Sequence, residues 1–148
     1  MILLGGGHVP TQQEFFQQIS LADHIWDFSG LIIGISAGTM NCAATVYAQP
    51  ELSGESIDPD YVRYLPGLAL TETMILPHYQ MVKDNILDGQ RLYEDITFAD
   101  SADNLFFVLV DGSYIVQQEE GAELFGEAYV IQDGVMGQIC EDGESISL

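Results

Sequence analysis

The stretch Gly34-Ile-Ser-Ala-Gly38 constrains the fold of this chain more than any other feature. The apolar run at residues 31–35 predicts a buried strand, and the small residues that follow predict a helix over 37–48, stopped by Pro50. A serine with a glycine two residues before it and another two residues after it, between a strand and a helix, is typical of a nucleophile elbow. This is a strained turn that exposes the serine side chain. The alternative interpretation is a tight turn in which Ser36 caps the helix.

A second apolar strand, predicted for residues 2–4, runs into Gly5-Gly6-Gly7. This pattern is typical of a buried strand that ends in a glycine-rich turn. Thr11 and Glu14 then have the spacing of a capping box at the start of a helix. Together with the elbow, this alternation of strands and helices indicates an α/β domain with a parallel sheet.

The second half of the chain has a different pattern. A strand over residues 68–76 and a helix over 83–95 are expected, followed by short apolar runs at 105–110, 114–116, 129–131 and 136–139. Asp111-Gly112 is expected to be a turn between the first two of these runs. Asp133-Gly134 lies between the last two, and Asp-Gly between apolar runs predicts a hairpin. The second half is therefore expected to be antiparallel. The length of 148 residues suits one domain over residues 1–148 with one core.

The charge of the chain argues against two classes of partner. It has 3 Lys and Arg against 23 Asp and Glu, a formal net charge of −20. Such a surface repels nucleic-acid phosphates and anionic membrane faces, so we expect neither partner. The first residues lack the basic region of a signal peptide, and no apolar stretch is long enough to span a membrane. The expected compartment is therefore the cytoplasm.

The sequence contains no recognisable metal or cofactor motif. It lacks His-x-x-x-His and Cys-x-x-Cys spacings, and its glycine run has neither the Gly-Lys-Ser/Thr ending of a phosphate-binding loop nor the G-x-G-x-x-G pattern. We therefore expect no metal and no cofactor. Cys42 and Cys140 lie far apart in the sequence and are expected to be free, buried thiols.

A serine nucleophile needs a base, and the chain has three histidines. His78 follows the strand predicted at 68–76, and catalytic groups in open α/β sheets gather at the carboxyl ends of strands, so it is the best base by position. His8 is a candidate for lining the pocket, and His24 is interpreted as structural. The backbone N–H of Ala37 is the first candidate oxyanion donor, and the glycine turn would supply the second.

Four stretches of the chain, taken in order, resemble one known family: LLGGGHVPTQQEFF, GISAGTMN, LPGLALTETMILPHYQ and VLVDGSYIV. The family is peptidase family S51, the group of aspartyl dipeptidase (peptidase E) and cyanophycinase. The chain resembles most its bacterial members described as type 1 glutamine amidotransferase-like proteins. The resemblance covers nearly the whole chain. It implies a serine-type peptidase acting on small peptides or amides. The implied fold is a flavodoxin-like, class I glutamine amidotransferase-like three-layer sandwich, mostly parallel, with a C-terminal antiparallel hairpin.

The resemblance also implies roles for individual residues. Ser36 matches the nucleophile, His78 the base, and Asp111 the acid, where peptidase E has a Glu. Glu51 and Glu55 are the alternative acids. The oxyanion hole would be formed by Gly6 and Ala37, and candidate substrate contacts are Gly5, Gly7, His8, Arg63 and Tyr79.

The chain departs from the family in two respects. The family carries further strand–helix units before the glycine turn, so we interpret these residues as the C-terminal two-thirds of an N-terminally truncated fold, whose uncovered surface would favour a homo-oligomer. Cations that could bind an acidic substrate are limited to Arg63, Lys83 and Arg91, which favours a neutral peptide, an amide or an ester. The alternative function is a catalytically silent binding or oligomerisation module that keeps the hydrolase fold.

Overall fold

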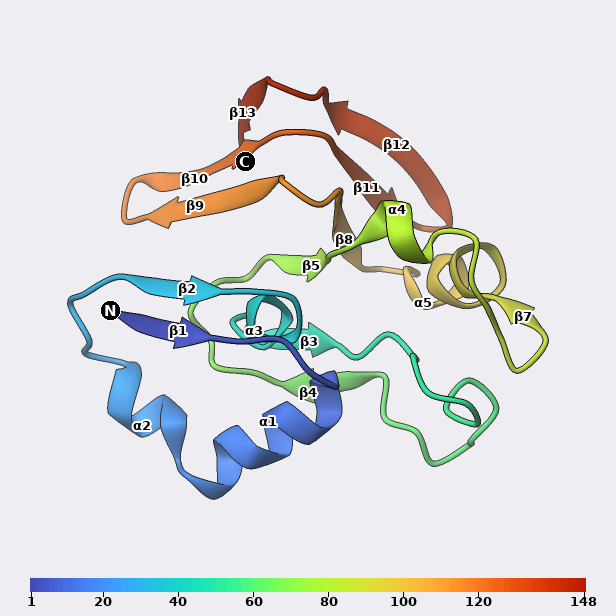
Figure 1. Ribbon diagram of the computed structural model, residues 1–148, viewed down its shortest axis with the longest axis horizontal. Helices are drawn as coiled ribbons and strands as arrows, with labels where there is room; N and C mark the ends of the chain where they lie inside the picture. Colours follow the sequence, from blue (N-terminus) through green and yellow to red (C-terminus); the bar gives the residue numbers. More distant parts are fainter. The chain divides into compact units, whose positions relative to one another are not determined.

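The computed structural model describes residues 1–148 and divides the chain into two compact units (Figure 1). The first unit contains Met1–Glu51 and Asp58–Met74, and the second contains Leu52–Ile57 and Ile75–Leu148. Both contain strands, and helices are short, so the chain is a mixed α/β protein as expected. None of its helices has the length and apolar character required to cross a membrane.

The first unit is built around a pair of parallel strands. β1 (Ile2–Leu4) pairs with β2 (Ile32–Gly34), and α1 (Val9–Gln18) and α2 (Leu21–Ile25) connect them. These elements confirm the strands predicted on either side of the first helix, but the predicted burial of the two strands is wrong, because Leu3 and Ile33 are exposed. One cluster of buried apolar side chains in this unit comes from β1, both helices and a later segment, and its members are Leu4, Phe16, Ile25 and Leu68.

Helix α1 begins earlier than the capping-box pattern predicted. His8 is the N-cap residue, Pro10 lies in the first turn, and Thr11 is inside the helix. Proline is favoured there because its fixed φ suits a helix and its missing N–H would have no partner. The Thr11 hydroxyl contacts His8 Nδ1 at 2.8 Å and does not cap a backbone N–H.

The helix predicted over 37–48 is wrong beyond its first turn. α3 (Ala37–Met40) is a single turn, and the chain continues as β3 (Thr45–Tyr47), which pairs antiparallel with β4 (Tyr64–Pro66). The β-branched and aromatic side chains of β3 favour a strand once a partner strand is available. The strand predicted over 68–76 is also wrong in its first part, because only β5 (Met74–Leu76) is extended.

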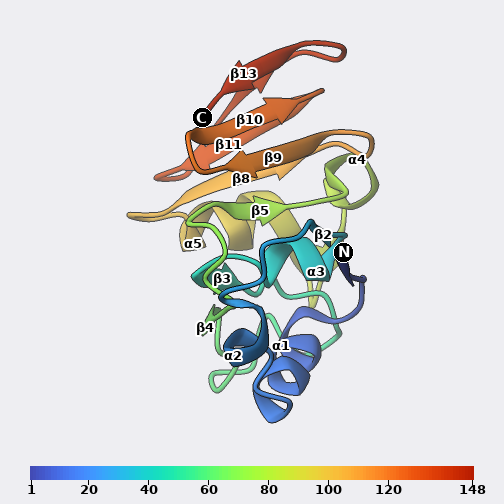
Figure 2. The ribbon, with the colours of Figure 1, turned by 90° about the vertical axis from the view of Figure 1, so that its left-hand side faces the viewer.

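The second unit contains two antiparallel arrangements, visible in both views (Figures 1 and 2). One sheet has the strand order β12-β11-β8-β5, with β8 (Leu105–Leu109), β11 (Ala128–Gln132) and β12 (Val135–Cys140) paired antiparallel. The other has the order β13-β10-β9, formed by β9 (Tyr114–Gln118), β10 (Gly121–Phe125) and β13 (Ser145–Ser147). Asp133 and Gly134 both have positive φ, 50° and 76°, so the predicted Asp-Gly hairpin is confirmed.

The helix predicted over 83–95 is wrong up to residue 91, and only residues 92–95 are helical. α4 (Tyr79–Val82) ends before it, and a hairpin of β6 (Ile86–Leu87) and β7 (Gln90–Arg91) takes its place. The π-helix η1 (Leu92–Thr97) then leads into α5 (Phe98–Asp100). The hairpin turns at Asp88-Gly89, where both residues have positive φ, and this Asp-Gly pair is the same hairpin signal as Asp133-Gly134.

The Asp88 carboxylate fastens the loop of residues 52–57 to this hairpin. It accepts hydrogen bonds from the N–H of Gly54 at 2.8 Å and from the hydroxyl of Ser56 at 2.7 Å. The N–H of Ser56 and the hydroxyl of Ser53 donate to the same carboxylate at 3.3 Å. These donors, the Ser56 hydroxyl first, hold the pKa of Asp88 below its usual value because they stabilise the charged form.

We predict that Asp88→Asn loosens the loop of residues 52–57. The amide cannot accept all the donors that converge on the carboxylate, so the Gly54 and Ser56 N–H groups should exchange with solvent deuterium faster. Because the folded pKa is lowered, the tie should be present above the usual carboxyl pKa and lost as the pH falls through the lowered one. Hydrogen–deuterium exchange at neutral pH, with the exposed Asp142→Asn as control, tests this. Equal exchange in both variants would contradict it.

Candidate active site

Ser36 lies at a strained turn between β2 and α3. Its φ and ψ are 56° and −122°, a combination that is unfavourable for any residue with a Cβ. The turn is closed by backbone hydrogen bonds from Gly38 N–H to Ile35 O at 3.0 Å and from Thr39 N–H to Ser36 O at 2.9 Å. The serine therefore occupies the strand–turn–helix geometry that an elbow requires.

The two glycines that flank Ser36 are required by close backbone approaches. A Cβ on Gly38 would lie 2.2 Å from the carbonyl oxygen of Leu4, at the end of β1. A Cβ on Gly34 would lie 2.7 Å from Cα of Thr39. Both distances are far inside van der Waals contact, and the atoms concerned belong to the backbone, so neither site can accept a side chain without moving the chain.

The glycine turn of residues 5–7 lies against Ser36 in the first unit. A Cβ on Gly6 would lie 3.2 Å from Cβ and 3.5 Å from Oγ of Ser36, whereas a Cβ on Gly5 or Gly7 would meet nothing within 4 Å. Ala37 is buried at the first position of α3, where a backbone N–H has no partner within the helix. The structure thus brings Ser36 together with the two residues predicted to donate to an oxyanion.

His78 and Asp111 meet in the second unit. His78 follows β5 with a left-handed backbone (φ 63°), and its Nδ1 lies 2.5 Å from Oδ1 of Asp111, which follows β8. Both side chains are partly exposed, 38% and 45%. The backbone N–H of Asp111 donates to Oε1 of Gln80 at 3.0 Å, and this bond fixes the turn that carries the carboxylate.

The two alternative acids, Glu51 and Glu55, each accept a hydrogen bond from a backbone N–H group. Glu51 Oε1 accepts a hydrogen bond from the N–H of Val9 at 3.4 Å, at the start of α1. Glu55 Oε2 accepts one from the N–H of Leu52 at 2.9 Å. A carboxylate near a helix N-terminus or a turn N–H is stabilised there, which gives each of these two a structural role.

The remaining candidate substrate contacts have side-chain neighbours of their own. His8 contacts Thr11, and the guanidinium of Arg63 lies 5.2 Å from the centre of the Tyr61 ring. Tyr79 packs against two other tyrosines of the second unit, with ring centres 5.2 Å and 5.1 Å apart, and these are Tyr93 and Tyr129. Burial raises the pKa of Tyr79, and nearby carboxylates add to that increase.

Three polar residues next to the candidate catalytic groups were missed by sequence reasoning. Gln80 holds the backbone of Asp111, Gln12 donates to the carbonyl of Gly5, and Asn41 donates to Gln12. Gln80 lies two residues after His78, and Gln12 and Asn41 lie within the stretches that carried the family resemblance. No residue pattern marks an amide side chain that acts through a neighbour, so their roles required the structure.

Cys42 is not activated as a nucleophile. Burial raises its pKa to about 11, and its Sγ donates to the carbonyl of Gly38 at 3.1 Å. Cys42 is partly buried and packs beside the core of the first unit, Cys140 is buried, and both are free thiols as expected.

We predict that Gly38→Ala strongly destabilises the chain. The new methyl group would overlap the Leu4 carbonyl, and overpacking typically costs about 1–3 kcal/mol. Urea denaturation followed by circular dichroism measures the loss. Gly137→Ala is the matched control, because a Cβ at Gly137 meets nothing within 4 Å. Equal midpoints for the two variants would show that the close approach does not exist.

We also predict that iodoacetamide does not modify Cys42 in the native chain at pH 8. With a pKa of about 11, only roughly one thiol in a thousand is ionised at that pH, and the thiolate is the reactive form. Peptide mass spectrometry should find Cys42 modified only after denaturation. Rapid modification of the native protein would overturn this account of the thiol.

Comparison with protein families identifies the relatives of the chain. The sequence model of peptidase family S51 matches residues 1–125, which include the serine turn, the glycine turn, His78 and Asp111. No curated protein is similar enough to the chain to be matched. The family match spans most of the 148 residues and agrees with the resemblance found in the four sequence stretches. The chain belongs to peptidase family S51.

Proposed function

We propose that the chain is a serine-type hydrolase of small peptides or amides, with Ser36 as nucleophile, His78 as base and Asp111 as the group that orients the base. The observation that carries the proposal is the 2.5 Å contact between His78 Nδ1 and Asp111 Oδ1, in a chain that belongs to a peptidase family. A carboxylate at Nδ1 fixes the ring orientation and leaves Nε2 available for a hydroxyl proton.

The proposed reaction has two covalent steps. Ser36 Oγ attacks the carbonyl carbon of the substrate while its proton passes to His78 Nε2, and the carbonyl oxygen becomes an oxyanion. When the oxyanion collapses, the bond to the amine breaks and His78 returns the proton to the amine. Water then attacks the acyl-serine ester by the same route, releasing the acid and restoring Ser36. Asp111 stabilises the imidazolium formed in each half of the reaction.

The backbone N–H groups of Ala37 and Gly6 are proposed as the oxyanion donors. Two observations support this: Ala37 N–H starts the helix directly after the nucleophile, and Gly6 approaches the Ser36 side chain without a Cβ between them. Donors held in position before the reaction stabilise developing charge without a cost for reorganisation. Removing one such donor in a serine hydrolase lowers the rate by about 10²–10³.

The surroundings of the cations favour a neutral substrate over an acidic one. Arg91 is engaged by Asp95, with Nε to Oδ2 at 3.0 Å and Nη2 to Oδ1 at 2.6 Å. The hydrogen bonds from Arg91 lower the pKa of Asp95 to about 2, so the pair stays charged across the neutral range. The Arg63 guanidinium lies over the Tyr61 ring, a cation–π contact that engages the second arginine. We therefore propose a neutral peptide or amide as substrate.

We propose that the chain has the flavodoxin-like three-layer sandwich fold that its resemblance to peptidase family S51 implies. The parallel pairing of β1 with β2 and the antiparallel pairing of β11 with β12 support this proposal. Peptidase activity in such a fold would place the nucleophile after a parallel strand, which agrees with Ser36 following β2.

A fluorophosphonate probe tests the proposed function. Ser36 Oγ would form a bond to phosphorus, fluoride would leave, and the hydroxyl proton would pass to His78. We predict that the wild-type chain is labelled on Ser36, that Ser36→Ala abolishes labelling, and that His78→Ala and Asp111→Asn slow it by at least about 10²-fold. Intact-protein and peptide mass spectrometry measure the label.

Matched controls come from exposed residues of the same types. Ser29→Ala, His24→Ala and Asp142→Asn should be labelled at the wild-type rate, since these side chains are exposed on the chain. An unlabelled wild-type chain that is folded by circular dichroism would overturn the hydrolase proposal and favour the silent binding module. Labelling that is unaffected by His78→Ala would reject His78 as the base.

A further inference from the structure

We propose that Gln12 is a positioning residue that, held by Asn41, fixes the glycine turn of residues 5–7 against the nucleophile. The side chain of Gln12 on α1 donates from Nε2 to the carbonyl oxygen of Gly5 at 2.8 Å. Its Oε1 in turn accepts a hydrogen bond from Nδ2 of Asn41 at 3.0 Å. This inference rests on the proposed function, because it assigns Gln12 to the oxyanion hole of that reaction.

The glycine turn needs an anchor outside itself. Three consecutive glycines have the largest backbone freedom of any tripeptide, so they pay the largest entropy cost when ordered. Packing restricts Gly6, which lies against the Ser36 side chain, but a Cβ at Gly5 or Gly7 would meet nothing within 4 Å, so the two outer glycines have open space beside them. The preceding Leu4 is held through its carbonyl by the N–H of Ile35 at 2.9 Å, and the bond from Gln12 extends this restraint to Gly5.

Asn41 connects this anchor to the serine turn. It caps the carboxyl end of α3, the helix that begins after Ser36, and its N–H donates to the carbonyl of Ala37 at 2.9 Å. Its own carbonyl accepts from the N–H of Leu68 at 2.9 Å. The hydrogen-bonded path therefore runs from the glycine turn through Gln12 and Asn41 to the one-turn helix that carries the nucleophile.

The burial of Asn41 indicates that its amide N–H₂ group is what the site uses. The residue is completely buried, and its Nδ2 donates to Gln12 and to the carbonyl of Val9 at 3.3 Å. Its Oδ1 is buried without a protein partner. The two hydrogen bonds of the Asn41 side chain are therefore both made by its N–H₂ group, and one of them goes to Gln12.

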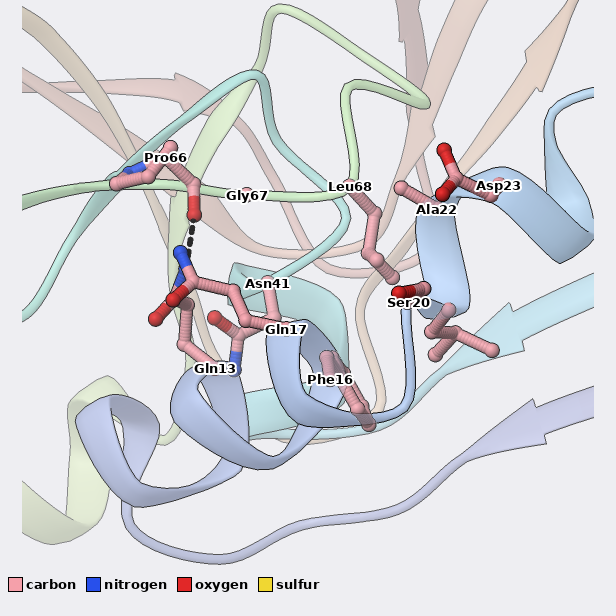
Figure 3. Close-up of a pocket in the computed structure, with 11 residues that line it drawn as sticks. Gln13, Phe16, Gln17, Ser20, Ala22, Asp23, Asn41, Pro66, Gly67 and Leu68 are labelled. Atoms are coloured by element: carbon pink, nitrogen blue, oxygen red, sulfur yellow. Dashed lines mark hydrogen bonds between the residues drawn. The ribbon is translucent and has the colours of Figure 1, made fainter.

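Gln13, the neighbour of Gln12, supplies a matched control. Its Nε2 also donates to a backbone carbonyl, that of Pro66, at 2.6 Å. Figure 3 shows this bond beside a cavity of about 130 Å³ that is lined by residues of α1 and α2, by Asn41 and by the segment Pro66-Gly67-Leu68. The two glutamines thus make the same kind of bond from the same helix, but Gln13 restrains a segment away from the glycine turn.

The test compares Gln12→Glu with Gln13→Glu in the full chain. Each variant keeps the side-chain size and removes the amide donor, so a carboxylate oxygen faces a carbonyl oxygen. Gln12→Ala and Gln13→Ala serve as a second pair if a glutamate variant fails to fold, which thermal unfolding detects. The first measurement is the mobility of the Gly5, Gly6 and Gly7 amides by ¹⁵N relaxation and hydrogen exchange, which does not depend on activity.

We expect Gln12→Glu to increase the mobility of the glycine amides and Gln13→Glu to leave it unchanged. With the fluorophosphonate, Gln12→Glu should lower the maximal rate of labelling by roughly tenfold, less than loss of a whole donor, with unchanged half-saturation concentration of the probe. Gln13→Glu should lower thermal stability without changing the maximal rate. If Gln12 only packed α1, its loss would not lower the maximal labelling rate while leaving the half-saturation concentration of the probe unchanged.

Three outcomes would overturn the inference. Unchanged mobility of the glycine amides in Gln12→Glu would show that Gln12 does not hold the turn. Increased mobility with an unchanged labelling rate would show that the turn does not act on the nucleophile. Equal effects of the Gln12 and Gln13 variants would indicate a role in packing of α1 alone. A wild-type chain that takes no label would overturn the proposed function instead, and the mobility measurement would still decide whether Gln12 fixes the turn.

Discussion

The close approach of Gly38 to the end of β1 is the constraint on which the first unit depends. Gly38 has no Cβ, so the one-turn helix after Ser36 can lie directly beside the strand that leads into the glycine turn. A Cβ at this position would lie 2.2 Å from the Leu4 carbonyl oxygen and would prevent the approach. This contact brings Gly6 to the Ser36 side chain and forces the serine into a left-handed backbone conformation. Strain at Ser36 is stabilised by the parallel β1–β2 pair on which the turn is built.

In the second unit, the sheet aligns a histidine with a carboxylate. Each of the two side chains follows a strand of the same sheet: β5 precedes His78 and β8 precedes Asp111. The left-handed backbone of His78 and the Gly112 turn after Asp111 aim the two side chains at each other. Gln80 adds a bond to the Asp111 backbone, so that the acid is held by both its side chain and its main chain.

The pattern of successful and failed sequence predictions follows from the range of the interactions involved. The strands around the two turns at residues 34–38 and 5–7 were predicted correctly because Gly and apolar residues act locally. The helix over 37–48 failed because Thr45, Val46 and Tyr47 find a partner strand 19 residues or so further along the chain, and pairing overrides local propensity. The helix over 83–95 failed because the Asp88-Gly89 turn reverses the chain inside it, and apolar spacing alone does not show that reversal.

The sequence by itself determined the family, the elbow with its two obligatory glycines, and the residue types of a serine, a histidine and an acid. These depend on short patterns whose geometry is local. Only the tertiary structure decided that Asp111 lies against His78, that Glu51 and Glu55 accept hydrogen bonds from backbone N–H groups, and that Gln12 and Asn41 hold the glycine turn. Those contacts join residues that are far apart in the chain, and a hydrogen bond between distant residues depends on how the strands and helices pack, which no short pattern records.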